Sequence, residues 1–489
     1  MQKKLSDFRG NEDGSILALF AVMMAIFFGV LALSFDFGRA ASTQSEMQSF
    51  ADNVALAAAG ELDRSPTAIA RATEAAQFLI TDSQSFGDGA STLNGGDFTL
   101  TFYSTRPDAT TPPTNDPTEA RFVTIDVTPR DVSPIFGAAF AALSGTDTDG
   151  AATVAARATA GFERQACDIT PLMICAPAAG INVDASIGTS MTLDVSVSTG
   201  TLVPGVVAML QPVNEVVPAV DALCDGLSGL GLDLCQIAAE GPRASCFPDT
   251  EAAAPTNLLD LEIDSALNTR FDIFGGAATG LVNNPLYPAA PNVLSSFQPS
   301  SGQCIANDPQ VSTSVMGLPG DDCQSTGGCP LLGNGDWSDG RQAYIDANYG
   351  GTDPHPDATT RYDFYLAEIE ASASGGGSSS GLLAGLGGGG LGGLVTDITD
   401  SILPSCSSQI SADPARRVVV TAFVDCSGGG INASVETLPI IDYAEVFLLS
   451  PAGLDPAGTL QVEILGGLSS DPQDNVTNAR VRSLVRLYD

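Results

Sequence analysis

The longest uninterrupted apolar stretch of the chain lies near its N-terminus. Residues Ile16 to Phe35 carry no charge, and twenty residues at about 1.5 Å each form a helix of roughly 30 Å, the thickness of a bilayer's hydrocarbon core. The pattern therefore predicts a transmembrane helix over residues 16–35. Asp36 and Arg39 end the stretch. With Gly38, we expect them to form a motif at the membrane boundary, where two charges three positions apart can pair and cost less than at the bilayer centre.

Beyond this boundary the pattern changes to one apolar stripe. The stripe falls at i, i+3, i+4, i+7 and i+11, which is one face of a helix, and consists of Met47, Phe50, Ala51, Val54 and Ala58. We expect an amphipathic helix over residues 42–62 that continues the membrane helix. Its face would be buried against the globular part of the chain or against a partner.

Small residues recur every four positions within the apolar stretch, at Ala21, Ala25 and Gly29. Such a stripe lets a second helix approach closely in lipid, so it is a candidate packing surface. Alanine-rich helices also contain such stripes by chance, and both interpretations stay open.

The basic residues predict the orientation of the span. Lys3, Lys4 and Arg9 precede it, which places the N-terminus in the cytoplasm and the bulk of the chain on the other side. Cleavage of a signal peptide near Ala40 and Ala41 is the alternative. A signal peptide has an apolar core of about 7 to 15 residues, so the longer stretch and the continuing helical pattern favour a retained anchor.

After the amphipathic helix the pattern predicts a small α+β head over residues 61–164. Its expected elements are a helix over 66–80, strands over 98–103 and 122–127, a short helix over 134–143 and a strand over 152–162. A long helix followed by such a head is a pilin-like arrangement.

The remainder divides by composition. Residues 165–370 are rich in cysteine and turn residues, with expected helices over 213–227 and 258–274. Residues 371–395 are a low-complexity Gly/Ser segment typical of a linker. Residues 396–489 contain strand patterns at 417–424, 443–449, 459–465 and 481–487, and we expect this β-rich region to pair with the region before the linker. The predicted class is α+β, with residues 1–14 as a cytoplasmic tail and 15–60 as an anchoring module.

Ten cysteines follow the span, a number that permits five disulfides and favours an oxidising compartment. Close spacing makes several pairings attractive: Cys167 with Cys175, Cys224 with Cys235 or Cys246, Cys323 with Cys329, and Cys406 with Cys426. The remaining cysteine is Cys304. Zinc binding is the competing interpretation, but no C-x-x-C pair occurs and His355 is the only histidine.

Charge and motifs exclude several functions. The formal net charge of −37 disfavours nucleic-acid binding, which needs clusters of Lys and Arg.

Asp194 to Ser198 matches the cation-binding pattern D-x-S-x-S, yet a half-exposed strand explains it equally well. Asn334 to Gly340 resembles a calcium loop, but position twelve of that register is Ile345, not an acid. An irregular calcium site there remains an alternative. No catalytic motif or cofactor site is predicted.

The N-terminal segment resembles a known family. Gly14, the apolar span, Asp36-Phe37-Gly38-Arg39 and the run from Met47 to Ala59 are similar to the TadG-like N-terminal module of the tight-adherence (Tad, or Flp) pilus-assembly proteins, over residues 14 to about 60. A looser likeness covers residues 171–175, 337–349, 361–369 and 417–426.

This resemblance implies a membrane-anchored, non-enzymatic component of pilus assembly in the bacterial inner membrane, facing the periplasm or cell surface. Its partners would be the inner membrane and other Tad/Flp proteins. Pilins of such systems carry a glutamate five residues after the cut, and that position is Leu19 here, so the resemblance favours a retained anchor over a fibre subunit. An envelope-anchored adhesin or cation-dependent binding module is the alternative function, and a secreted hydrolase is a third.

Overall fold

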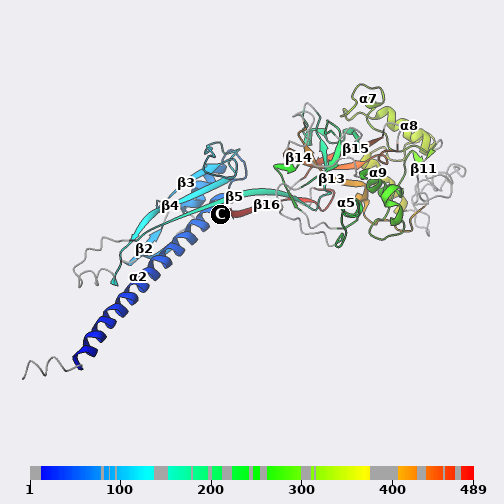
Figure 1. The fold of residues 1–489 in the computed structure, drawn as a ribbon. Coiled ribbons are helices and arrows are strands. Elements are labelled where there is room, and N and C mark those ends of the chain that lie inside the picture. The colour runs from blue at the N-terminus through cyan, green and yellow to red at the C-terminus, as the bar shows by residue number, and fades with distance from the viewer. Residues whose placement is uncertain are drawn as a thin grey trace, which may run out of the picture. The chain divides into compact units, whose positions relative to one another are not determined.

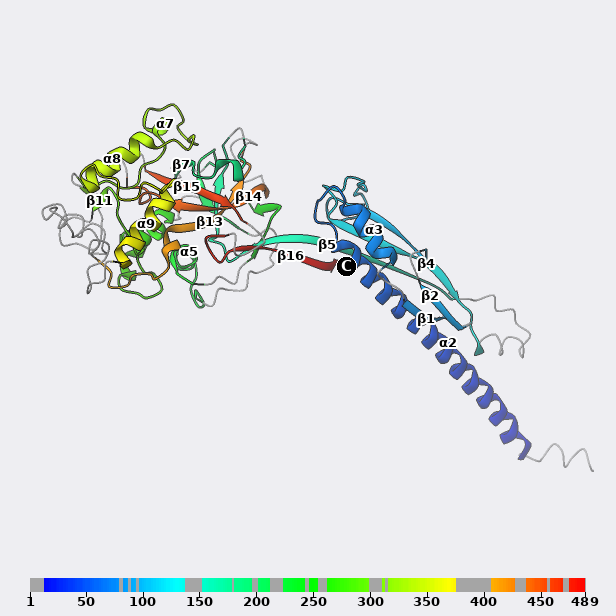
Figure 2. The ribbon, with the colours of Figure 1, turned by 180° about the vertical axis from the view of Figure 1, so that it is seen from behind.

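The computed structural model describes residues 13–78, 82–86, 89–93, 96–136, 152–177, 180–195, 201–211, 223–241, 246–253, 262–298, 310–312, 315–374, 406–426, 437–454, 458–468 and 475–488. The chain is α+β and divides into two compact units (Figures 1 and 2). Unit 1 contains Met1–Glu163 and Ser483–Asp489, and unit 2 contains Arg164–Arg482. Unit 2 is therefore inserted into the sequence of unit 1.

Unit 1 is built on one uninterrupted helix, α2, which runs from Asp13 to Ala59. The predicted membrane helix and the predicted amphipathic helix are thus continuous (Figure 1). At about 1.5 Å per residue, 47 residues span roughly 70 Å, more than twice the hydrocarbon thickness. The helix ends before Gly60, whose N–H donates to the Leu56 carbonyl at 3.0 Å, rather than at the predicted residue 62.

An antiparallel sheet packs on the second half of α2. In unit 1 its strand order is β16-β5-β4-β3, with bounds Arg480–Tyr488, Ala152–Cys167, Phe122–Val132 and Phe98–Tyr103. The predicted strand at 98–103 is confirmed, and those at 122–127 and 152–162 are confirmed but longer. The predicted strand at 481–487 is β16, and residues 483–488 of it belong to unit 1, not to the C-terminal layer.

Two smaller elements complete the described part of unit 1. Helix α3, Ala68–Phe78, lies beside α2 and buries Ala72 and Ala76 in the same core. It begins two residues after the start of the expected helix over 66–80, and residues 79 and 80 of that helix lie outside the described residues. Most of the expected helix over 134–143 also lies outside the described residues. A separate antiparallel hairpin consists of β1, Asp82–Phe86, and β2, Gly89–Leu93.

Unit 2 is organised around a curved sheet in the order β7-β15-β14-β13-β6-β8. The bounds are Ser190–Asp194, Thr459–Gly467, Thr437–Leu448, Val418–Val424, Leu172–Cys175 and Val207–Met209. β6 and β13 are parallel. A bridge between Asp194 and Val206 links the two ends of this order and closes the sheet on itself. The expected pairing across the linker is therefore confirmed for β13 with β6 and for β15 with β7.

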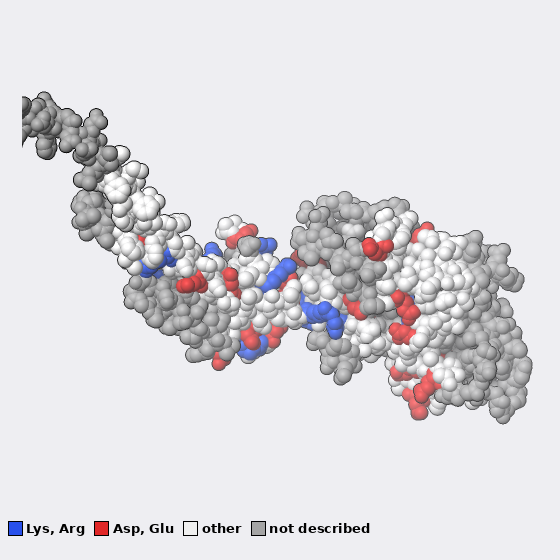
Figure 3. All heavy atoms as spheres, turned by 90° about the horizontal axis from the view of Figure 1, so that it is seen from below, with Lys and Arg blue, Asp and Glu red and all other residues white. Residues whose placement is uncertain are grey.

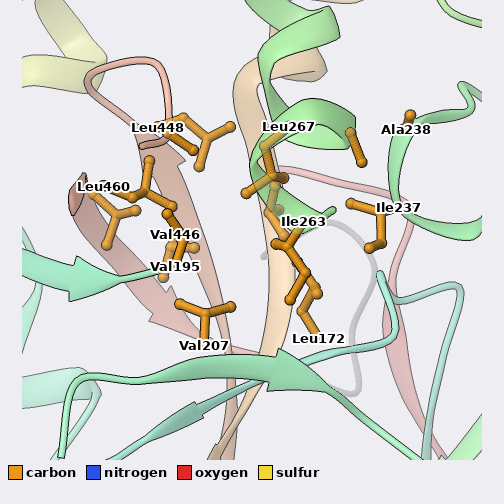
Figure 4. Close-up of a cluster of buried hydrophobic side chains, with 14 of the residues drawn as sticks. Leu172, Val195, Val207, Ile237, Ala238, Ile263, Leu267, Val446, Leu448 and Leu460 are labelled. Carbon is orange, nitrogen blue, oxygen red and sulfur yellow. The ribbon is translucent and has the colours of Figure 1, made fainter. Parts of the chain in front are cut away.

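One face of this sheet forms the main core with two short helices, α5 (Leu230–Ala238) and α6 (Ile263–Asn268). Figure 4 shows Ile263 and Leu267 of α6 among side chains of the sheet such as Val446 and Leu460. Residues 258–261 of the expected helix over 258–274 lie outside the described residues. The helical run ends before residue 274, because Asp272 adopts a left-handed φ of 62° after a single 3-10 turn. Of the expected helix over 213–227, the described residues 223–227 are not helical.

At one end of the opposite face, Val418 of β13 and Phe447 of β14 pack with α8, Ser338–Tyr349, and α9, Arg361–Ser374. Aromatic side chains dominate this second core, and Tyr365 of α9 lies 4.9 Å from Phe447 of β14 between ring centroids. The rest of this face belongs to a third buried cluster, which includes Val420 and Ala422 of β13. The shorter elements of unit 2 are β9 (Cys246–Pro248), β10 (Glu251–Ala253), β11 (Phe297–Gln298), β12 (Gln310–Val311) and α7 (Asp322–Ser325). The first four residues of the predicted linker over 371–395 are instead the last turn of α9, and residues 375–395 lie outside the described residues.

Candidate assembly module and the ectodomain

The first half of α2 exposes an apolar surface. Its large side chains from Leu19 to Phe37 are exposed, Leu33 by 72% and Phe37 by 74%. Among the described residues this is the one helix long and apolar enough to cross a membrane. Figure 3 shows its described surface without Lys, Arg, Asp or Glu until it approaches the sheet. Exposure of this kind is unfavourable in water and favourable in lipid.

The candidate packing stripe lies on this exposed part of the helix. Ala21 and Ala25 are exposed and Gly29 is partly buried. The surface that these three residues share is therefore accessible to a second helix.

The boundary motif contacts a short loop that follows β4. The Asp36 carboxylate accepts hydrogen bonds from the N–H groups of Ile135 at 3.0 Å and Phe136 at 3.3 Å. Arg39 donates to the Ser133 carbonyl at 3.2 Å. No atom lies within 4 Å of a Cβ placed on Gly38, so this glycine faces open space. The motif holds a loop nearly a hundred residues away in sequence, which the spacing of Asp36 and Arg39 did not indicate.

The predicted amphipathic face is buried completely. Burial on α2 begins at Thr43, and the side chains of Met47, Phe50, Ala51, Val54 and Ala58 are inaccessible to solvent. Phe50 packs on Phe98 of β3, with ring centroids 5.9 Å apart. The face thus belongs to the core of unit 1 and is covered by the chain's own sheet.

Two glutamines on α2 set the register between the helix and β5. Gln44 donates to the Ala155 carbonyl, and Gln48 donates to the Arg157 carbonyl at 2.9 Å. Because both acceptors are main-chain groups of one strand, the helix is held at a fixed position along β5. Neither glutamine belongs to the predicted apolar face of this helix. The i, i+4 spacing of two glutamines beside that face was the available signal.

The helix geometry agrees with the comparison to known proteins. Residues 14–61 match the family described as putative Flp pilus-assembly TadE/G-like. These residues form a TadE/G-like module. The match begins at the start of α2 and ends just beyond its last turn. No curated protein and no solved structure matches the chain.

Beyond the TadE/G-like module, four disulfides lie among the described residues. Cys224 is bonded to Cys235 and Cys323 to Cys329, as their short spacing indicated. The pairing of Cys167 with Cys175 is wrong, because Cys167 is bonded to Cys246 across paired strands.

The pairing of Cys406 with Cys426 is also wrong. Cys426 is bonded to Cys175, 251 residues away, beside the parallel strands β6 and β13. We call this the long-loop disulfide and Cys224–Cys235, with a separation of 11, the short-loop disulfide. Cys304 lies outside the described residues.

The acidic segment considered for calcium serves as a helix start instead. Asp336 accepts hydrogen bonds from the N–H and hydroxyl of Ser338, at 3.2 and 2.9 Å, and these bonds lower the pKa of its carboxyl. Asp322 accepts from the N–H groups of Asp339 and Gly340, both at 2.9 Å. Among the described residues no group of three or more His, Cys, Asp and Glu is arranged to hold a metal ion. Of the D-x-S-x-S segment only Asp194 and Val195 are described.

Buried charges in unit 2 are satisfied within the fold. Arg361 pairs with Asp321 and, at 3.1 Å, with Glu463, and all three side chains are fully buried. Burial lowers the pKa of Arg417 to about 10, and this guanidinium donates to the Leu448 carbonyl at 2.6 Å. These contacts stabilise the fold and place no reactive group at the surface.

A second buried group is Glu368 of α9. Burial raises the pKa of its carboxyl, which accepts hydrogen bonds from the hydroxyls of Tyr344 and Tyr349, both at 2.6 Å. Burial likewise lowers the pKa of His355, whose ring lies 5.1 Å from that of Phe364. Glu368 thus lies inside a packed cluster, and His355 is half-buried at its edge.

Unit 2 also contains a polar cleft of about 430 Å³. Charged residues from separate segments line it: Asp168, Glu240, Arg270, Asp413 and Arg416. Arg270 and Arg416 are themselves buried and donate to the Ile237 and Ala238 carbonyls, both at 2.7 Å. The cleft therefore has charged residues of both signs in its lining.

Proposed function

We propose that this protein is a single-pass component of the bacterial inner membrane that supports assembly of a Tad (Flp) pilus and surface adherence through protein–protein contacts. The TadE/G-like match at residues 14–61 supports a pilus-related, structural role. The observation that carries the proposal is the division of α2 into an exposed apolar half and a half whose apolar face is buried under a sheet. One rigid element thereby connects a lipid-suited surface to a folded head.

The orientation follows from the charges before the span. Lys3, Lys4 and Arg9 support an N-terminus in the cytoplasm, with the head of unit 1 and the whole of unit 2 in the periplasm or at the cell surface. Four disulfides in unit 2 suit such an oxidising compartment. Within the membrane, the open stripe of Ala21, Ala25 and Gly29 would be the surface on which a span of another pilus-system protein packs.

A deletion variant that removes unit 2 must preserve the strand order of the sheet in unit 1. Removing everything after Glu163 would also remove β16, which lies beside β5 and contributes Tyr488 to a ring contact with Phe122 at 5.4 Å. Replacing Arg164–Arg482 by a short Gly/Ser linker keeps residues 483–488 of that strand. The TadE/G-like module and its complete head then remain on the membrane without unit 2.

Three strains test the proposal: wild type, a whole-gene deletion, and the linker replacement. We expect the whole-gene deletion to lose surface fibres, counted by electron microscopy, and to lose attachment with them. The linker replacement should stay in carbonate-washed membranes and retain part of the fibre count. Normal fibres together with failed attachment in the whole-gene deletion would contradict an assembly role.

That contradicting result is what an envelope-anchored adhesin predicts. The polar cleft of unit 2 favours this second candidate, because it is a concave surface with charged residues of both signs. Under that function the linker replacement would abolish attachment and leave fibres unchanged.

A further inference from the structure

The loop held by the boundary motif lies at the level where the apolar span ends. Phe136 packs on Phe35, with ring centroids 4.9 Å apart and an interplanar angle of 83°. Phe35 is the last residue of the apolar stretch that begins at Ile16. If that stretch fills the hydrocarbon core, the Phe136 ring lies at the edge of the core on the side of the head.

The loop presents apolar side chains directly after a buried strand end. Ile135 is 51% exposed and Phe136 is 45% exposed, whereas Val132, at the end of β4, is buried. The sequence carries no charge from Val132 to Thr146. Ile135 and Phe136 therefore extend the exposed apolar surface of α2 laterally, away from the helix axis.

Three main-chain polar groups of this loop are bonded to α2. Asp36 accepts the N–H groups of Ile135 and Phe136, and Arg39 donates to the Ser133 carbonyl. Backbone enters a membrane only at a high cost when its N–H and C=O groups lack partners. The boundary motif supplies partners for three of these groups and so lowers the cost of placing the loop at the lipid interface.

We propose that residues Ser133–Phe136 form a second membrane contact, in which Ile135 and Phe136 insert into the outer edge of the leaflet that contains the end of the apolar stretch at Phe35. The proposal rests on the membrane anchoring proposed above and goes beyond it, because a single helix would leave the head free to rotate and tilt. A second contact at a fixed height fixes the sheet of unit 1 against the bilayer surface. The partner is the lipid itself.

Depth-dependent quenching of tryptophan tests this inference on the full chain. The protein is reconstituted in vesicles of phosphatidylethanolamine and phosphatidylglycerol that carry bromine either near the headgroup or near the end of the acyl chain. Separate variants place the probe in the loop (Phe136→Trp, with Ile135→Trp as a second position), in the middle of the span (Phe27→Trp), and in the loop at the far end of the sheet (Glu119→Trp). The native Trp337 is present in all variants and supplies a common baseline, measured in the wild type.

We expect the tryptophan at 136 to be blue-shifted and quenched mainly by bromine near the headgroup. The tryptophan at 27 should be quenched mainly by bromine near the chain end, and that at 119 by neither. Quenching at 27 but not at 135 or 136 overturns the loop contact and leaves the anchor intact. Absence of quenching at 27 overturns the anchor and the loop contact together.

A second substitution tests the role of the boundary motif. Asp36→Ala removes the acceptor for two loop N–H groups, and we expect it to reduce quenching at 136 to the level at 119 while quenching at 27 is unchanged. Gly38→Ala is the matched control, because its added methyl group meets no atom within 4 Å. Undiminished quenching at 136 in the Asp36→Ala protein would overturn the proposal that this carboxylate holds the loop in the interface.

Discussion

Removal of one ring at the centre of the buried face of α2 should weaken unit 1 selectively. Phe50 is fully buried and packs on Phe98 of β3. Phe50→Ala deletes the largest side chain on that face. Its helix neighbours Ala51 and Ala55 are also buried, and a methyl group cannot fill the space that the ring leaves.

The expected magnitude follows from the cost of a core cavity. Phe→Ala at a buried site costs about 3–5 kcal/mol, and we expect the upper part of this range because the small neighbours cannot collapse onto the cavity. Since about 1.4 kcal/mol corresponds to a factor of ten, amide exchange that requires unit 1 to open should accelerate by about a hundred- to a few thousand-fold.

Hydrogen exchange followed by mass spectrometry, on the full chain in detergent micelles, measures this change strand by strand. Peptides from β4 report unit 1, and peptides from β13 report unit 2 within the same sample. The control is Phe37→Ala, which removes the same ring from an exposed position of the same helix and should leave β4 unchanged. Unaltered β4 exchange in Phe50→Ala would refute the reasoning, because the face would then not hold the sheet to α2.

Three further predictions concern unit 2 and use urea unfolding of the full chain, followed by emission of the buried Trp337. Replacing both cysteines of the long-loop disulfide by alanine should lower the free energy of unfolding by about 5 kcal/mol, and the same change at the short-loop disulfide should lower it by about 3 kcal/mol. The difference arises because loop-closure entropy grows with the number of residues enclosed. Equal losses for the two variants would contradict this prediction. Arg361→Met leaves two buried carboxylates uncompensated and should cost about 3–5 kcal/mol, clearly more than Arg341→Met at a partly exposed pair. Burial raises the pKa of Glu368, so the folded state binds this proton more tightly than the unfolded state does, and the resulting contribution to stability is present below the ordinary pKa of 4.5 and lost as pH rises through the raised pKa. Glu368→Gln should flatten this dependence of the unfolding free energy on pH. An unchanged dependence in the variant would contradict the prediction.

Elements whose pattern is local were predictable from the sequence. The apolar stretch and the stripe beginning at Met47 are each set by residues within a few turns, and both fall on α2. The alternation in residues 98–103 likewise indicated β3 with its observed bounds. The expected helix over 258–274 is confirmed only in part for an equally local reason, since a left-handed Asp272 is not visible in an apolar pattern.

Features that depend on distant partners were not predictable in this way. Cys175 lies eight residues from Cys167, but its partner is Cys426, because parallel pairing of β6 with β13 brings those ends together. The boundary motif indicated a charge pair on one helix, while the structure shows a loop bound to it. Spacing along the chain measures proximity only within an element, and each of these contacts joins separate elements.

The insertion of unit 2 has a consequence for how the TadE/G-like module is completed. β16 follows unit 2 in the sequence, yet it lies beside β5 in the sheet, where Arg486 pairs with Glu163 at 3.1 Å across 323 residues. Contacts of such separation form late, because the intervening loop must close first. The buried face of α2, by contrast, is covered by β3, β4 and β5, which precede unit 2. The helix can therefore be packed on its sheet while unit 2 is still unfolded, and the final strand joins only afterwards. Anchoring and folding of unit 2 are thereby separable steps within one chain.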